Sequence, residues 1–133
     1  MYEILAAIDD DVDGVRAQVD AIESMVDVAD DVVVHLLHVF TDNPSGASIM
    51  QVESAREASE RLEALGVEVR AEETSGDPAS QVLERAERED VDQICVGGRK
   101  RSPTGKALFG SVTQDVILGT ERPVLVCGRR TES

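Results

Sequence analysis

The sequence is poor in aromatic residues, lysine, cysteine and long apolar runs. Aromatic residues make up 2% of its 133 residues, and it has no tryptophan and two cysteines. Its apolar runs, such as 32–34 and 124–127, are far shorter than the ~20 residues that cross a bilayer. The chain begins Met1-Tyr2-Glu3, without a positive region ahead of an apolar stretch. We therefore expect no membrane partner, no export signal and a cytoplasmic location.

The length and composition are those of one globular domain. Domains usually contain about 100–150 residues, and 41% of this chain is hydrophobic, with its four prolines and ten glycines in no repeat. We expect a domain over residues 1–128 and a polar tail over residues 129–133. Cys95 and Cys127 each lie within an apolar stretch, which favours buried, reduced thiols over a disulfide framework.

Acidic residues greatly outnumber basic ones, 27 against 13, which gives a net charge of −14. A chain this negative repels nucleic acid and anionic membranes, so we expect neither as a partner. The acidic excess and the scarcity of lysine resemble halophilic proteins of salt-loving archaea, in which salt screens the repulsion. The charge is uneven, because residues 1–96 hold 24 acids and 6 bases, whereas residues 97–133 hold 3 acids and 7 bases.

Short apolar segments alternate with amphipathic segments along the chain. Strands are predicted at 4–8, 32–39, 67–71, 94–96 and 123–127. Apolar residues at steps of three and four predict helices at 12–26, at 48–65, from Pro78 onward and at 108–119. Strands that alternate with single helices pair in parallel through right-handed crossovers. The sequence therefore predicts an α/β fold, an open five-stranded parallel sheet with helices on both faces.

Local signals mark the ends of two predicted helices. Ser48 and Gln51 have the spacing of a capping box, and Gly66 provides a stop at the other end of that helix. Asp77 can cap the next helix, with Pro78 at its first position, where the missing N–H costs nothing.

The loop after the fourth predicted strand has the features of an anion site. In open parallel sheets, ligands bind where the carboxyl ends of the strands meet, and the loops at 9–11, 40–47 and 97–107 all open on this edge. The last of these is glycine-rich and basic, and it leads into a helix. Free amides, a helix dipole and nearby cations together favour phosphate. Arg99 and Arg101 are equally compatible with plain exposed loop charges.

Other phosphate-binding motifs do not fit. Six residues separate Gly98 from Gly105, where a Walker A loop needs four, and Lys106 is followed by alanine. The first strand is followed by Asp9-Asp10-Asp11 in place of the dinucleotide fingerprint. A phosphate-receiver domain is excluded, since its phosphoacceptor Asp and its lysine are missing from the ends of the third and fifth strands.

Four places in the chain together resemble the universal stress protein family. They are Ile8-Asp9, Leu37-His38-Val39, the loop from Gly97 to Ser111 and Arg122-Pro123-Val124-Leu125-Val126. The family signature reads glycine, two residues, glycine, nine residues, glycine, then serine or threonine. Gly97, Gly110 and Ser111 match this spacing, and Lys100 stands at the position of the second glycine.

The resemblance implies a Rossmann-like fold with strand order 3-2-1-4-5 and an adenine-nucleotide site. By position, Asp9 and Val39 contact the adenosine. The ribose and phosphates are expected at Gly97, Arg99, Lys100, Gly110, Ser111 and Val112. The expected ligand is ATP, with AMP or ADP as alternatives, and the expected metal is Mg or Mn.

Lys100, in place of a glycine, affects phosphate binding in two opposite ways. A side chain there blocks the approach of phosphate, or strains the backbone by about 1–3 kcal/mol if φ is positive. Yet a lysine cation ~4 Å from phosphate contributes a similar energy of opposite sign. Three functions therefore stay open: a stress-response protein that binds an adenine nucleotide, a non-nucleotide-binding member that acts through dimerisation and a partner protein, and an ATP-using hydrolase or ligase of the same broad fold.

The last strand is expected to form a homodimer. Val124, Leu125 and Val126 make an edge strand with few charges to keep it from pairing, and family members pair such edges around a two-fold axis.

Several polar residues have a second interpretation. Asp9, Asp10 and Asp11 suit a divalent cation, or they cap the first helix. His35 and His38 face opposite sides of one strand, so they cannot share a metal and are expected in the core or at an edge. Ser111 has no base near it in the sequence, so we expect no catalytic residue and at most a slow ATPase.

Overall fold

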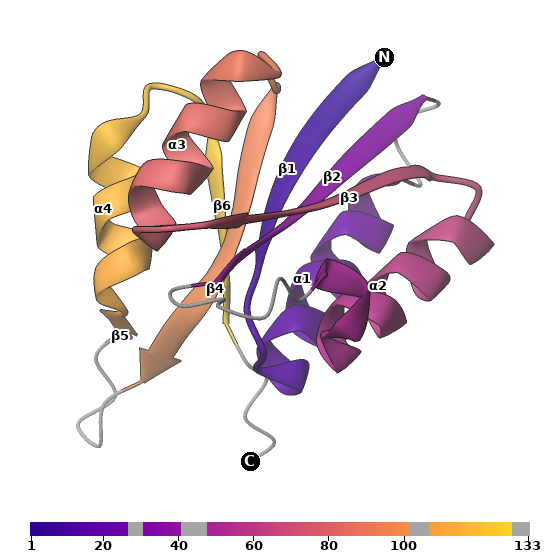
Figure 1. Ribbon diagram of the computed structural model, residues 1–133, viewed down its shortest axis with the longest axis horizontal. Helices are drawn as coiled ribbons and strands as arrows, with labels where there is room; N and C mark the ends of the chain where they lie inside the picture. The colour runs from indigo at the N-terminus through magenta and orange to yellow at the C-terminus, as the bar shows by residue number, and fades with distance from the viewer. Residues whose placement is uncertain (27–30, 41–47, 102–106, 129–133) are drawn as a thin grey trace.

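The structure is a computed structural model that describes residues 1–26, 31–40, 48–101 and 107–128, with only the backbone at 99–101 and 107–109. Figure 1 shows the arrangement of its helices and strands. The strands are β1 (Tyr2–Ile8), β2 (Val32–Phe40), β3 (Glu68–Ser75), β4 (Gln93–Arg101), β5 (Ala107–Phe109) and β6 (Val124–Gly128). The helices are α1 (Val12–Val26), the short 3-10 helix η1 (Ile49–Gln51), α2 (Glu53–Ala64), α3 (Pro78–Arg88) and α4 (Ser111–Gly119).

Five of the strands form a parallel sheet. β1 pairs with β2 and with β4, β3 pairs with β2, and β6 pairs with β4. The order β3-β2-β1-β4-β6 is the predicted order 3-2-1-4-5, with β6 as the fifth parallel strand. The α/β fold and the strand order are therefore confirmed. As this order requires, β3 lies at one edge of the sheet.

Helices cover both faces of the sheet, which explains the uninterrupted apolar runs of the central strands. Figure 1 shows α1 and α2 on one face and α3 and α4 on the other. In β1, Ile4, Ala6 and Ile8 belong to the apolar cluster under α1 and α2, whereas Leu5 belongs to the cluster under α3 and α4. Alternate residues of a strand point to opposite faces, so a strand buried on both faces has no polar position.

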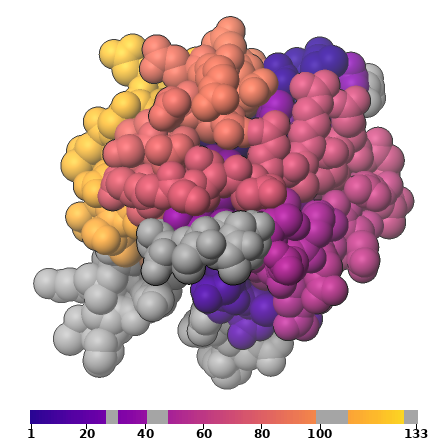
Figure 2. All heavy atoms as spheres, in the orientation of Figure 1, coloured from indigo at the N-terminus to yellow at the C-terminus, as the bar shows by residue number. Residues whose placement is uncertain are grey.

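Figure 2 shows the same side of the molecule with all its atoms. The segment from β3 to α3 crosses the front, between α4 on one side and α2 on the other. Among the described residues, no helix combines the length and the apolar character that a membrane span requires.

Two predictions for residues 97–109 are wrong. The segment 97–107 is not one long loop, because β4 continues to Arg101 and pairs with the antiparallel strand β5. Leu108 belongs to β5, and α4 begins only at Ser111. Leu108 and Phe109 fit the helical spacing of the apolar residues that follow, but pairing with β4 satisfies their backbone groups as a strand.

The predicted helix ends form with one difference. Ser48 and Gln51 make the capping box, but it opens the 3-10 helix η1, and α2 starts after it at Glu53. Gly66 adopts φ +84° after α2, and the Asp77 carboxylate accepts the Ser80 N–H at 3.0 Å, with Pro78 at the start of α3. Residues 41–47 of the loop predicted at 40–47 lie outside the described residues.

Cys95 and Cys127 are both buried, as predicted. Their sulfurs lie 3.7 Å apart, and neither forms a disulfide. The contact with Cys127, together with burial, raises the pKa of the Cys95 thiol. The Cys95 thiol is therefore protonated at neutral pH.

The irregularity in β4 between Val96 and Arg99 requires a glycine at one position, and this requirement can be tested. Gly98 has φ +87°, and a Cβ there would stand 2.9 Å from Thr113 Oγ1. We expect Gly98→Ala to lower the free energy of unfolding by about 1–3 kcal/mol, measured by urea denaturation. Gly110→Ala is the control, since no described atom lies within 4 Å of its Cβ position, and it costs about 0.5 kcal/mol or less. Equal losses in the two variants would contradict this account.

Candidate functional site

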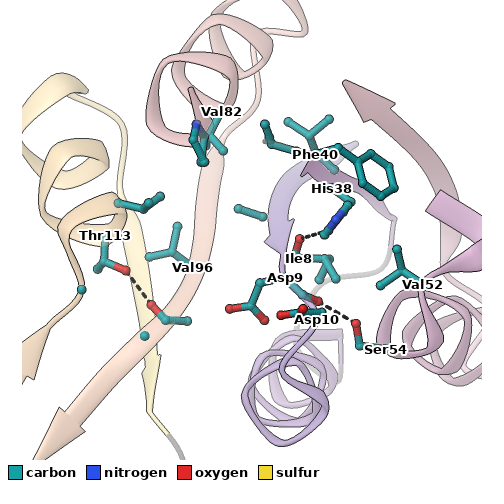
Figure 3. A pocket seen from close by; sticks show the side chains of 18 of the residues that line it. Ile8, Asp9, Asp10, His38, Phe40, Val52, Ser54, Val82, Val96 and Thr113 are labelled. Carbon is teal, nitrogen blue, oxygen red and sulfur yellow. Dashed lines mark hydrogen bonds between the residues drawn. The ribbon is translucent and has the colours of Figure 1, made fainter. Parts of the chain in front are cut away.

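A pocket of about 890 Å³ opens at the carboxyl ends of β1, β2 and β4. Its walls also include residues from the start of α1, α2, α3 and α4, and Figure 3 shows it from close by. Six of the eight predicted site residues line it: Asp9, Val39, Gly97, Gly110, Ser111 and Val112. The fold thus brings together residues that are up to about a hundred positions apart in the sequence.

The other two predicted residues, Arg99 and Lys100, are described by their backbone alone. Arg99 is opposite Phe109, and Lys100 is opposite Leu108, in the antiparallel pair of β4 and β5. A strand is extended backbone that any residue adopts, so the strain considered for Lys100 does not arise. The left-handed residue in this turn is Gly98, two positions earlier.

Asp9 follows β1 directly and its carboxylate lies in the pocket (Figure 3). The main chain holds it in place, because Asp11 N–H donates to Asp9 Oδ1 at 2.9 Å and Ser54 Oγ donates to the Asp9 carbonyl at 2.6 Å. Partial burial raises the pKa of Asp9, and the charges of Asp11 and Asp10 add to the rise, although the Asp11 N–H opposes it. Ionisation of the Asp9 carboxyl group is therefore less favourable in the folded protein than it is for an ordinary aspartate.

The N-terminus of α4 forms the opposite wall. Gly110 is its N-cap residue, and within the described part of the chain no side chain caps the helix. The first amides of a helix have no partner within the helix and carry the positive end of its dipole. Thr113, which is buried, ties this end to β4 by donating its hydroxyl to the Gly97 carbonyl at 2.7 Å. The wall is therefore suited to a negatively charged group.

Between these two walls the lining is largely apolar. Val39, Val52, Val82 and Val96 contribute aliphatic surface. Phe40 packs edge to face with the His38 ring, with their centroids 4.4 Å apart and an interplanar angle of 77°. Such a surface accepts a flat, partly apolar group, whereas the ends of the pocket offer a carboxylate and free amides.

His38 was expected only as a core or edge histidine, and its place in the pocket was missed. Its Nδ1 lies 2.7 Å from the Ile8 carbonyl, and since a carbonyl only accepts, Nδ1 carries the proton. His35 is buried and contacts Glu3 at 3.0 Å, away from this pocket. The position of His38 at the end of the second predicted strand was the available signal, because that edge is where ligands bind.

Gly98, which lies in the loop expected to bind an anion, also lines the pocket, as do Ser54 and Thr113, which sequence reasoning did not identify. In the sequence they look like ordinary helix and turn residues. Their contribution depends on contacts with strand ends that lie more than ten residues away, and such contacts have no local pattern.

The three consecutive aspartates do not act alike. Asp9 and Asp10 line the pocket, whereas the Asp11 carboxylate lies over the first turn of α1, 2.9 Å from where a Cβ on Gly14 would stand. Over the residues that the structure describes, no group of three or more His, Cys, Asp or Glu side chains is arranged to hold a metal ion.

Sequence comparisons place the chain among known proteins. The family model described as "Universal stress protein family" matches residues 1–128. Two universal stress proteins of Methanocaldococcus jannaschii are similar, one with 32% identity over 74 residues and one with 36% over 69 residues. These matches cover 56% and 52% of this chain but 44% and 43% of the relatives. The matched part is thus less than half of each curated relative.

Structure comparisons cover almost the whole chain. A universal stress protein from Archaeoglobus fulgidus superimposes with a TM-score of 0.70 and 27% identity, covering 96% of this chain and 98% of that one. An Arabidopsis thaliana family protein with AMP bound gives a TM-score of 0.74 at 18% identity, covering 98% and 94%. An Archaeoglobus fulgidus universal stress protein in complex with dAMP gives 0.64 at 21% identity, covering 96% and 98%. With the family model matching 128 of its 133 residues, the chain belongs to the universal stress protein family.

Proposed function

We propose that this protein binds an adenine nucleotide in the pocket at the carboxyl edge of the sheet and acts in the response to stress. The observation that carries the proposal is the pairing of two opposite walls, the Asp9 carboxylate and the uncapped N-terminus of α4. A nucleotide has the matching parts, hydrogen-bond donors at one end and phosphate at the other. The AMP and dAMP complexes of the two structurally similar proteins support the same ligand class.

In the proposed binding mode, adenosine lies against the apolar lining beside Asp9 and Val39. The Asp9 carboxylate accepts hydrogen bonds from the nucleoside, and a charged acceptor forms stronger hydrogen bonds than a neutral one. The ribose and phosphates lie toward Gly97, Gly110, Ser111 and Val112, where amides of the helix start donate to phosphate oxygens. In this arrangement the Asp9 carboxylate faces donors of the nucleoside, and the amides at the start of α4 face the phosphates.

ATP is the proposed ligand, with AMP and ADP as the alternatives. Arg99 and Lys100 add positive charge to the segment that leads toward α4, and charge of this sign favours a longer phosphate chain. Mg or Mn, bound with ATP, would take most of its oxygen ligands from the phosphates. Water molecules would supply the rest, because Asp9 lies at the adenosine end of the pocket.

The proposed setting is the cytoplasm of a cell with concentrated salt. A net charge of −14 is unfavourable in a compact chain at low ionic strength. In molar salt the Debye length falls to about 3 Å, so this repulsion is largely screened. The proposed functional unit is the domain at residues 1–128.

Calorimetry in molar KCl tests nucleotide binding. We expect heat of binding from both ATP and AMP, and about tenfold weaker binding in Gly110→Ala, which adds a methyl group at the helix start proposed to receive phosphate. Lys100→Gly, measured in parallel, gives the sign of the lysine contribution. If neither the parent nor Lys100→Gly releases heat, nucleotide binding is wrong, and the alternative of a member that acts through dimerisation and a partner protein replaces it.

Asp9→Asn separates binding from stability. We expect about tenfold weaker nucleotide binding, because a charged acceptor becomes neutral. The raised pKa of folded Asp9 means that its contribution to stability is present at low pH and is lost as the pH rises through that pKa. The variant is therefore as stable as the parent at about pH 3 and at least as stable at neutral pH. Thermal unfolding at both pH values checks this, and unchanged affinity in the variant would refute the role of Asp9.

We also propose that the protein is a homodimer that pairs through β6. Val124, Leu125 and Val126 are only half-buried, and among the described strands β6 pairs with β4 alone. An edge with apolar side chains and unpaired backbone groups favours pairing with a second copy.

Light scattering in molar KCl tests the dimer. We expect the mass of two chains for the parent and of one chain for Val126→Lys, because a lysine on this edge places like charges against each other. Glu73→Lys, on the opposite edge strand β3, is the control and leaves the mass unchanged. A monodisperse monomer for the parent is the result that removes the proposal.

A further inference from the structure

Gln18 is a polar residue in the middle of an apolar helix face. It is 2% exposed, and its neighbours on the buried face of α1 are Val15, Val19 and Ile22. Burying an amide costs free energy unless hydrogen bonds replace those lost to water. The hydrogen bonds of the Gln18 side chain must therefore offset the cost of burying its amide.

The Gln18 amide joins two different strands. Its Nε2 donates to the Ala7 carbonyl of β1 at 3.0 Å and to the Cys95 carbonyl of β4 at 3.2 Å. An amide nitrogen carries two hydrogens, so these two acceptors use both. The side-chain oxygen Oε1 lies 3.5 Å from where a Cβ on Gly97 would stand. One side chain thus contacts both strands that border the pocket.

These contacts occur where the two strands separate. The parallel pairing of β1 with β4 runs from Ile4 opposite Gln93 to Ala6 opposite Cys95 and ends there. Beyond this point the pocket lies between the strand ends, with Ala7 and Val96 in its walls. The two carbonyls that Gln18 binds are at the end of the pairing, and its amide replaces the donors that a continued pair of strands would supply.

We propose that Gln18 is a positioning residue that sets the separation of the strand ends on which the pocket is built. Ala7 precedes Asp9 by two residues, and Cys95 precedes Gly97 by two residues. A side chain that fixes both carbonyls thereby fixes the distance between the Asp9 wall and the Gly97 turn. The effect on ligand affinity rests on the proposed adenine-nucleotide function, whereas the effect on the positions of Asp9 and Gly97 does not.

Gln18→Met tests the proposal, because methionine has a similar length but no donor. Its control is Val19→Ala, which removes buried volume from the same helix without touching either carbonyl. In Gln18→Met we expect about tenfold weaker AMP binding by calorimetry. We also expect shifts of the Asp9 and Gly97 backbone amides in nuclear magnetic resonance spectra that exceed the shift at Ile22, one turn further along α1. Val19→Ala loses stability in thermal unfolding but keeps its AMP affinity within about twofold.

The outcomes separate the two proposals. If Gln18→Met binds AMP like the parent and the Asp9 and Gly97 amides do not shift, the positioning role is wrong. If Val19→Ala weakens binding as much as Gln18→Met, affinity simply follows stability, and the role is also wrong. If the parent binds no AMP, the nucleotide proposal fails, and the amide shifts still decide the role of Gln18. Gln18→Asn, which keeps the amide but is too short to reach both carbonyls, gives the same shifts and replaces Gln18→Met if that variant does not fold.

Discussion

The site depends on one topological constraint, which is that β1 and β4 are neighbours whose chains continue on opposite faces of the sheet. α1, which follows β1, covers one face, and α4, which follows β4, covers the other (Figure 1). Two chains that leave a shared edge in opposite directions cannot close the space between them, so a crevice forms at this point. The pairing of β1 with β4 ends at Ala6 and Cys95, and the pocket begins there.

The crevice exposes backbone N–H and C=O groups that a continuous sheet would pair. Side chains form hydrogen bonds with some of the C=O groups. Ser54, His38 and Thr113 each hydrogen-bond a carbonyl, those of Asp9, Ile8 and Gly97 respectively. Gln18 binds two more carbonyls on the side of α1. All these contacts satisfy acceptors, and none uses the amides at the start of α4. Among the described residues no side chain caps these amides, and donors at that end of the pocket favour an anion.

The sequence was informative where structure follows from local periodicity and less so where it follows from contacts between distant segments. The apolar run at 4–8 and the stripe of α1 predicted a buried strand and its helix, and with the family resemblance they led to the confirmed strand order. Gly97 and Gly110 both line the pocket, at the edge of the sheet where a spaced motif and the topology both predicted a site. β5 was missed because Leu108 and Phe109 fit a helical spacing as well as a strand. Gln18 was missed because a glutamine on a helix is usually exposed.

The acidic surface and an anionic ligand are compatible because they act over different distances. In concentrated salt the charge of −14 has little influence beyond about 3 Å, so neither the surface acids nor the basic segment at 99–101 attracts or repels a nucleotide from far away. For the proposed nucleotide, recognition then depends on groups in direct contact with it: apolar lining, helix amides and the Asp9 carboxylate. Such contacts depend on the positions of these groups more than on the net charge of the protein. On the proposed role of Gln18, the hydrogen bonds that hold the strand ends apart therefore matter more than they would in a protein that attracts its ligand over a long range.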